Sequence, residues 1–179
     1  MSTNIVVLSG SPRKNGSTER LVQEFIAGAR EAGKAVTEFR VADLKIAPCL
    51  GCGSCHQSGI CVHEDDMPQI LDALRSADAL LFASPIYYWN VTAQLKTAID
   101  RFYSSLRVNP MTVKRAALIL TSGNAAPDTC EGAIITYKRI CKHQNWEDAG
   151  IVAAQSLHAA AMLDGRAELE QARELGRKL

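Results

Sequence analysis

The chain has 179 residues, of which 20 are Lys or Arg, 19 are Asp or Glu, and 47% are hydrophobic. This length and composition predict a single compact domain over residues 1–179. A net charge of +1 excludes a broad electrostatic attraction to nucleic acid or to an anionic membrane. The apolar runs are too short to span a bilayer and the N-terminus lacks the pattern of a signal peptide, so we expect a cytoplasmic protein with neither kind of partner.

Short apolar runs alternate with longer amphipathic stretches along the chain, a pattern typical of strands joined by crossover helices. The predicted strands are residues 4–9, 36–41, 79–84, 116–121 and 150–156, and the predicted helices are residues 17–32, 67–76, 92–106, 130–144 and 166–175. The alternating polarity of the second strand indicates an edge position. Right-handed crossovers then predict an α/β three-layer sandwich with a five-stranded parallel sheet in the order 2-1-3-4-5.

The loop after the first predicted strand, residues 10–18, combines glycines, hydroxyls and two cations ahead of a helix. Backbone N–H groups at a helix start, together with hydroxyls and a guanidinium, suit a phosphate dianion. The candidate binding residues are Ser11, Arg13, Asn15, Ser17 and Thr18. The Walker and Gly-x-Gly-x-x-Gly patterns do not occur here, which argues against an NTPase or a standard NAD domain. The alternative is an ordinary turn in which Ser17 caps the helix.

The loop after the third predicted strand is rich in aromatic residues. Its candidate binding residues are Pro85, Ile86, Tyr87, Tyr88, Trp89 and Asn90, which Ser122 and Gly123 would face from the loop after the fourth strand. Adjacent rings on a proline-stiffened backbone suit a flat heteroaromatic ligand. A molecule with a phosphate at one end and a flat ring at the other would engage all these loops, and FMN has that form. Alternatively, the aromatic residues pack under the sheet rim or form a subunit contact.

Four of the six cysteines lie in a segment at residues 48–66, the cysteine loop, with the spacing CxxCxxCx5C. The candidate metal ligands are Cys49, Cys52, Cys55 and Cys61. Intervening glycines let the loop curl the thiols toward one point, and four thiolates in a compact run suit an iron–sulfur cluster more than zinc. Zinc held with the help of His56 or His63, redox-active thiols, and simple packing of the sulfur side chains stay open.

The remaining cysteines and histidines belong to no motif. Cys130 and Cys141 occupy helical positions, and we expect them to be buried as small hydrophobic side chains. His143 and His158 are interpreted as surface or structural residues.

Together these segments resemble the flavodoxin-like NAD(P)H-dependent FMN reductases and, within them, the iron-sulfur flavoproteins. The likeness extends from residue 5 to about residue 156 and rests on segments 10–18, 48–55, 65–67 and 84–87, on Lys96, and on residues 99–101. It implies that the first loop binds the FMN phosphate, that segment 84–90 holds the isoalloxazine ring, and that the cysteine loop carries a [4Fe–4S] cluster. It also implies a homodimer or homotetramer in which a neighbouring subunit helps to close the flavin pocket.

The predicted function is FMN-dependent transfer of electrons from NAD(P)H, or from a ferredoxin-like donor through the cluster, to a small-molecule acceptor such as a quinone or free flavin. The flavin supplies the electronic chemistry, so we expect no catalytic triad. Two alternatives of other classes remain, a non-enzymatic electron carrier of the flavodoxin type and a zinc-stabilised binding module. The net charge of +1 argues against the carrier, because such carriers are usually acidic for docking.

Overall fold

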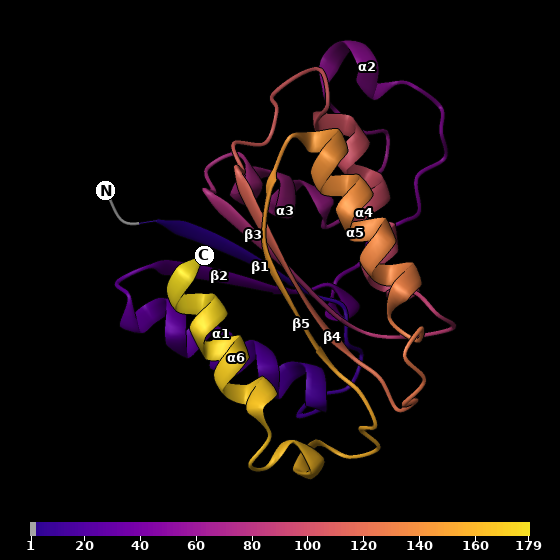
Figure 1. Cartoon of the computed structure of the whole chain (residues 1–179). Helices are drawn as coiled ribbons and strands as arrows, with labels where there is room; N and C mark the ends of the chain where they lie inside the picture. Colours follow the sequence, from indigo (N-terminus) through magenta and orange to yellow (C-terminus); the bar gives the residue numbers. More distant parts are fainter. Residues whose placement is uncertain (1–2) are drawn as a thin grey trace.

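The structure, a computed structural model, describes residues 3–179. Within that range a sheet of five strands runs in the order β2-β1-β3-β4-β5, with every neighbouring pair parallel (Figure 1). The strands are β1 (Asn4–Ser9), β2 (Ala35–Arg40), β3 (Ala79–Pro85), β4 (Arg115–Thr121) and β5 (Glu147–Ala154). The predicted topology is confirmed, and the carboxyl ends of all five strands lie along one edge of the sheet.

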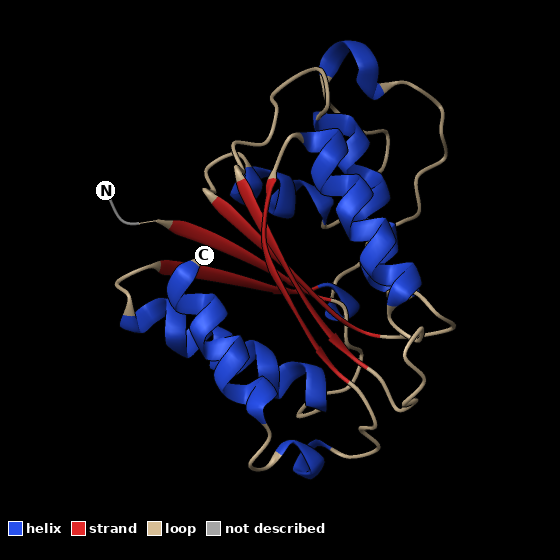
Figure 2. Ribbon diagram, viewed as in Figure 1, coloured by secondary structure: helices blue, strands red, loops and turns tan. Residues whose placement is uncertain are grey.

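Helices cover both faces of the sheet, as Figure 2 shows, which confirms the three-layer α/β sandwich. One face carries α1 (Ser17–Glu31) and α6 (Ala167–Lys178), and the other carries α3 (Met67–Leu74), α4 (Ala93–Asp100) and α5 (Glu131–Gln144). The shorter elements are α2 (Cys55–Ser58), which stands apart from the sheet, and the 3-10 turns η1 (Val41–Asp43), η2 (Arg101–Ser105) and η3 (Ala160–Leu163). No helix among residues 3–179 is long and apolar enough to cross a membrane.

The strand pattern in the sequence follows from burial on two faces. Along β1, Val6 and Leu8 enter the core beneath α3, α4 and α5, whereas Ile5 and Val7 enter the core beneath α1 and α6. β3 and β4 are buried almost throughout in the same way, as central parallel strands are. β2 lies at the edge and is only partly buried, which confirms the edge position predicted from its alternating polarity.

Most elements begin or end at least one residue away from their predicted bounds, and two of these differences have a structural reason. β5 begins at Glu147, three positions before the predicted start at 150, because a bulge opposite Ala116 and Ala117 lets two polar residues join the strand ahead of its apolar run. The predicted helix 92–106 is α-helical only as far as Asp100 and continues as η2. Ile99 and Phe102 still face the core, because a 3-10 turn also places residues three apart on one side.

Two glycines set the distance between α1 and α6. A Cβ atom on Gly28 would lie 1.9 Å from the carbonyl oxygen of Arg173, and a Cβ atom on Gly176 would lie 2.0 Å from the carbonyl oxygen of Phe25. The backbones of the two helices are therefore in direct contact. Glu31, at the end of α1, forms ion pairs with Arg173 and Arg177 of α6 at the margin of this contact.

We predict that Gly176→Ala destabilises the protein. In an open helix this change is favourable by about 1 kcal/mol, but here the added methyl group would push the two backbones apart, at a cost of roughly 1–3 kcal/mol. Chemical denaturation measures the free energy of unfolding. Gln171→Ala, on an exposed position of the same helix, is the control and should change it by less than about 0.5 kcal/mol. A more stable Gly176→Ala variant would contradict the close approach.

Candidate functional site

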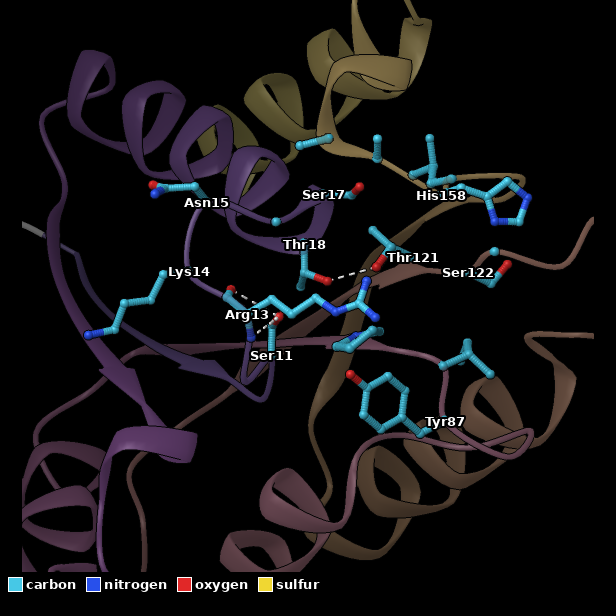
Figure 3. A pocket seen from close by; sticks show the side chains of 17 residues that line it. Ser11, Arg13, Lys14, Asn15, Ser17, Thr18, Tyr87, Thr121, Ser122 and His158 are labelled. Atoms are coloured by element: carbon cyan, nitrogen blue, oxygen red, sulfur yellow. Dashed lines mark hydrogen bonds between the residues drawn. The ribbon is translucent and has the colours of Figure 1, made fainter.

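A cavity of about 470 Å³ lies at the carboxyl edge of the sheet (Figure 3). Its wall is built from the loops that follow four of the five strands. It consists of Ser11 and residues 13–18 after β1, residues 85–87 at the end of β3, residues 121–123 at the end of β4, and residues 157–160 after β5. All the binding residues predicted in the first loop and after β4 are therefore brought together, along with Pro85, Ile86 and Tyr87.

The chain can leave β1 toward this cavity because residue 10 has no side chain. A Cβ atom on Gly10 would lie 2.7 Å from the Cβ atom of Leu95 and 2.8 Å from Oγ1 of Thr92. The backbone of Gly10 is fixed in this narrow space, since its N–H donates to the carbonyl of Ala83 at 2.8 Å and its carbonyl accepts from the Thr92 hydroxyl at 2.8 Å. The first loop therefore starts from a rigid point between β3 and α4.

The amino end of α1 points into the cavity. Gly16 is the N-cap, and Ser17 is the first helical residue, so the alternative in which Ser17 caps the helix is wrong. Without a side-chain cap, the N–H groups of the first helical turn stay available to an anion, which the helix dipole also favours. The Arg13 side chain extends across the cavity, whereas Lys14 extends away from it (Figure 3).

Hydroxyl groups form the polar floor of the cavity. The hydroxyls of Thr18 and Thr121 are hydrogen-bonded at 2.7 Å, which ties the start of α1 to the end of β4. The Ser122 hydroxyl donates to the carbonyl of Asn124 at 2.8 Å and so shapes the loop after β4. These contacts leave the floor rigid and polar between the helix start and the ring of Tyr87.

Residues 87–90 form a tight two-residue turn. The backbone N–H groups of Tyr87 and Asn90 each donate to the carbonyl of the other, at 2.9 and 3.2 Å. Tyr88 and Trp89 have φ angles of 50° and 65°, the left-handed backbone of a type I′ turn that favours Asn-Gly, so two aromatic residues there are strained. The turn leaves Tyr88 95% and Trp89 55% exposed.

These positions put three of the predicted binding residues outside the cavity wall. Tyr87 lines the cavity, whereas Tyr88, Trp89 and Asn90 do not. The Asn90 amide is used within the fold, since Nδ2 donates to the Thr136 hydroxyl at 3.3 Å and Oδ1 accepts from the N–H of Val91 at 2.8 Å.

The fourth part of the wall is formed by residues 157–160, none of which is a predicted binding residue. Arg20 of α1 holds this segment by donating to the carbonyl of Ala160 and by pairing with Asp164 at 2.8 Å. His158 packs on the loop after β4, because a Cβ atom on Gly123 would lie 3.3 Å from its Nδ1 atom. No motif marks this segment. The parallel topology alone could have indicated it, since β5 ends at the same edge as the other strands.

The cysteine loop lies away from this cavity. Cys49 and Cys52 are exposed, Cys55 and Cys61 are partly buried, and all four are free thiols that contribute nothing to the cavity wall. Within residues 3–179 no three His, Cys, Asp or Glu side chains are close enough together to hold a metal ion. The structure thus places the four predicted ligands on one loop without gathering their sulfur atoms.

The other two cysteines lie in the core, as predicted. Cys130 is 3% exposed and Cys141 is 4% exposed. Burial is the main cause of the raised pKa of each thiol, which keeps both groups protonated and unreactive.

Both ends of the cysteine loop are held by one buried ion pair. Nη1 and Nη2 of Arg101 donate to the two carboxylate oxygens of Asp65 at 2.6 and 3.2 Å, and Nη1 also donates to the carbonyl of Ala47 at 2.8 Å. The same carboxylate accepts the N–H of Ala47 at 2.9 Å and that of Met67 at 3.1 Å. The side chains of Arg101 and Asp65 are only 2% and 7% exposed.

The pair is held in its charged form. Burial is the largest single influence on the pKa of each group, and it disfavours the charged form. For Asp65, the hydrogen bonds from Arg101 and from the two backbone N–H groups together outweigh burial. For Arg101, the hydrogen bonds to Asp65 and the charge of that carboxylate outweigh it. As a result, the pKa of Asp65 is lowered below 3.8 and that of Arg101 is raised. Buried pairs of this kind are costly to break one side at a time.

Comparisons with known proteins place these features in context. A sequence model described as NADPH-dependent FMN reductase matches residues 3–133. An iron-sulfur flavoprotein of Archaeoglobus fulgidus is 41% identical over 96 residues, which are 54% of this chain and 44% of that protein. One of Methanosarcina thermophila is 33% identical over 121 residues, which are 68% of this chain and 63% of that protein. The chain therefore spans only about half to two thirds of these relatives.

The fold is also shared with solved structures. A NAD(P)H:quinone oxidoreductase from Methanothermobacter marburgensis superposes with a TM-score of 0.75, over 99% of this chain and 96% of that one. Its sequence is 18% identical to this chain, so the likeness is one of fold.

Proposed function

Because the chain belongs to the NADPH-dependent FMN reductase family, we propose that it is an FMN-dependent oxidoreductase and that its FMN lies in the cavity at the carboxyl edge of the sheet. One observation carries this proposal. A single cavity joins the amino end of α1, where an anion is favoured, to the ring of Tyr87 and the backbone of Gly123. A ligand that spans it needs a negative charge at one end and a flat group at the other.

The residues present fit FMN. The N–H groups of the first turn of α1, the Ser17 hydroxyl and the guanidinium of Arg13 are the donors that a phosphate dianion needs. The Ser11 hydroxyl also lines the cavity but donates to the carbonyl of Arg13 at 3.3 Å. Between Tyr87 and Gly123 the wall offers an aromatic side chain on one side and bare backbone on the other, which suits a flat ring. The volume of about 470 Å³ is in the usual range for a cofactor site.

The bound flavin supplies the hydride and electron chemistry of the reaction. The chain's part is to hold and orient it. The start of α1 and Arg13 hold the phosphate end of the flavin. The hydrogen bond between Thr18 and Thr121 fixes the surface on which its flat ring lies. Along the cavity wall after β3 and β4, the N–H groups of Ile86, Tyr87 and Ser122 are already used within the fold, so the N–H of Gly123 is the donor left for negative charge that develops on the ring during reduction.

We further propose NAD(P)H as the electron donor and a small molecule such as a quinone as the acceptor. The family description and the name of the Methanothermobacter neighbour support these classes. A ferredoxin-like protein is the alternative donor. We also propose a homodimer or homotetramer in which the exposed Tyr88 and Trp89 face a neighbouring subunit, since their turn holds them rigidly outside the chain's own cavity.

Replacing Arg13 and Ser17 together with alanine should weaken FMN binding by at least about 100-fold, because two charge-assisted bonds of about 1.5–3 kcal/mol each to the phosphate would be lost. Fluorescence titration of the flavin-free protein measures the affinity. Riboflavin has no phosphate and should bind the variant and the wild type equally. Lys142→Ala removes an exposed charge that lies outside the cavity wall and should change FMN affinity little. Wild-type protein that takes up no FMN would end the proposal.

Rapid mixing with NADPH separates an enzyme from an electron carrier. We expect the FMN-loaded protein to lose its flavin absorbance in a single fast phase, because hydride passes from the nicotinamide to the flavin. An electron carrier of the flavodoxin type would keep its absorbance under the same conditions. NADH should be run beside NADPH, and reduction by neither would contradict the proposed donor.

The cysteine loop is proposed as the site of a [4Fe–4S] cluster, with Cys49, Cys52, Cys55 and Cys61 as its ligands. The donor set fits in kind, since four free thiols share one loop, and the names of the relatives support it. Left-handed backbone at Gly51, Gly53 and Gly59 shows where the loop can curl. The sulfur atoms of these four cysteines are not gathered around one point in the described part of the chain.

Anaerobic reconstitution with iron and sulfide, followed by metal analysis, tests the cluster. We expect about four irons per chain, and we expect Cys52→Ser to lose the cluster absorbance while it keeps bound FMN, because Cys52 does not line the cavity. Cys141→Ala removes a buried cysteine outside the loop and should keep its iron. Full iron content in Cys52→Ser, or zinc in place of iron, would show that the assignment is wrong.

A further inference from the structure

The buried side chain of Arg101 has one donor left over. Its two terminal nitrogens are engaged by Asp65 and by the carbonyl of Ala47, but its Nε–H is buried and finds no hydrogen-bond partner within residues 3–179. Leaving a charged donor buried and unsatisfied is costly. Pairing with Asp65 uses only the terminal nitrogens, so it does not explain why the Nε–H is buried without a partner.

Cys61 lines the same cavity as this guanidinium, and Cys49 follows two residues after Ala47, whose carbonyl the guanidinium binds. Cys61 and Cys49 are the groups that, after Asp65, contribute to the raised pKa of Arg101. The cavity shared by Arg101 and Cys61 has a volume of about 630 Å³ and lies beneath the loop. The unused donor thus lies in the part of the molecule where the first and last cysteines of the loop are located.

The hydrogen bonds of Asp65 show why these two cysteines stay near each other. Ala47, two residues before Cys49, and Asp65, four residues after Cys61, are joined directly at 2.9 Å and are both bonded to Arg101. Just outside these two residues, the backbone N–H of Asp66 donates to the carbonyl of Lys45 at 2.9 Å. The run of four cysteines is therefore closed at its two ends, whatever the residues between them do.

We propose that Arg101 is a positioning residue for the iron–sulfur cluster of the cysteine loop. Its terminal nitrogens hold the two ends of the loop so that Cys49 and Cys61 can ligate the same cluster, and its Nε–H donates to an anionic sulfur of that cluster. This inference rests on the proposed cluster and not on the proposed FMN site. A cluster with thiolate ligands is anionic, so a buried, permanently charged donor beside it stabilises the reduced form and raises the reduction potential.

The test needs variants that remove the charge without leaving half of a buried pair. Replacing both partners, Arg101→Met with Asp65→Leu, exchanges the ion pair for apolar side chains of similar size, a change that buried pairs often tolerate. Arg101→Lys keeps the charge but lacks the planar fork and the Nε–H. Arg75→Met is the matched control, because Arg75 lines the same cavity but is engaged by Asp72 and by the carbonyl of Asn109.

Each variant is reconstituted anaerobically, and its iron content, cluster reduction potential and FMN affinity are measured. We expect the double variant to bind FMN as the wild type does, because neither residue lines the FMN cavity. Its iron should be held about 10- to 100-fold more weakly, the usual effect of losing a group that supports metal ligands. The cluster that remains should have a more negative potential. Arg101→Lys should recover part of the iron, and Arg75→Met should match the wild type in both readouts.

Unchanged iron affinity and potential in the double variant would overturn the proposal and reduce the ion pair to a structural role. If the double variant fails to fold, Arg101→Lys decides alone, because a wild-type potential and full iron content there would show that the fork and the Nε–H are not needed. Wild-type protein that takes up no iron would overturn both the cluster and this role of Arg101. The FMN proposal would still stand, since it is tested by titration.

Discussion

The site depends on one constraint of chain direction in the sheet. β1 and β3 are adjacent and parallel, yet the helices that follow them lie on opposite faces, α1 with one core and α4 with the other. The segments that follow β1 and β3 therefore diverge as they leave the sheet edge, and a crevice opens between them. The start of α1 and segment 85–87 are placed on the two sides of this crevice, and the loops after β4 and β5 complete the candidate FMN site.

Much of this arrangement is predictable from the sequence, because it follows from backbone direction and from burial. The strands are continuous apolar runs, and the loop after β1 carries its glycines and hydroxyls beside one another in the chain. The outward position of Tyr88 and Trp89 was not predictable, since it depends on left-handed backbone at two aromatic residues, and aromatic composition alone suggests a ligand wall. The pairing of Asp65 with Arg101 joins residues 36 positions apart, which no local pattern can reveal.

Electrostatics divide the molecule into two regions of different character. At the sheet edge, positive charge comes from a helix start and from exposed Arg13, so a dissociable anion can be bound there and exchanged. Beneath the cysteine loop, positive charge comes from a guanidinium that is 2% exposed, so a bound anionic group would be held in a fixed position. The first arrangement suits a cofactor that is taken up after folding, and the second suits a group assembled in place.

The closed ends of the cysteine loop have a consequence for how such proteins diverge. Since the chain departs and returns at a single point, bonded at Ala47 and Asp65, the sandwich underneath does not depend on the length of what lies between. Lengthening such a segment adds little entropic cost, because closure entropy grows only slowly with length. This stretch is therefore a place where evolution can exchange one insert for another, or delete it, while the remaining architecture is inherited unchanged.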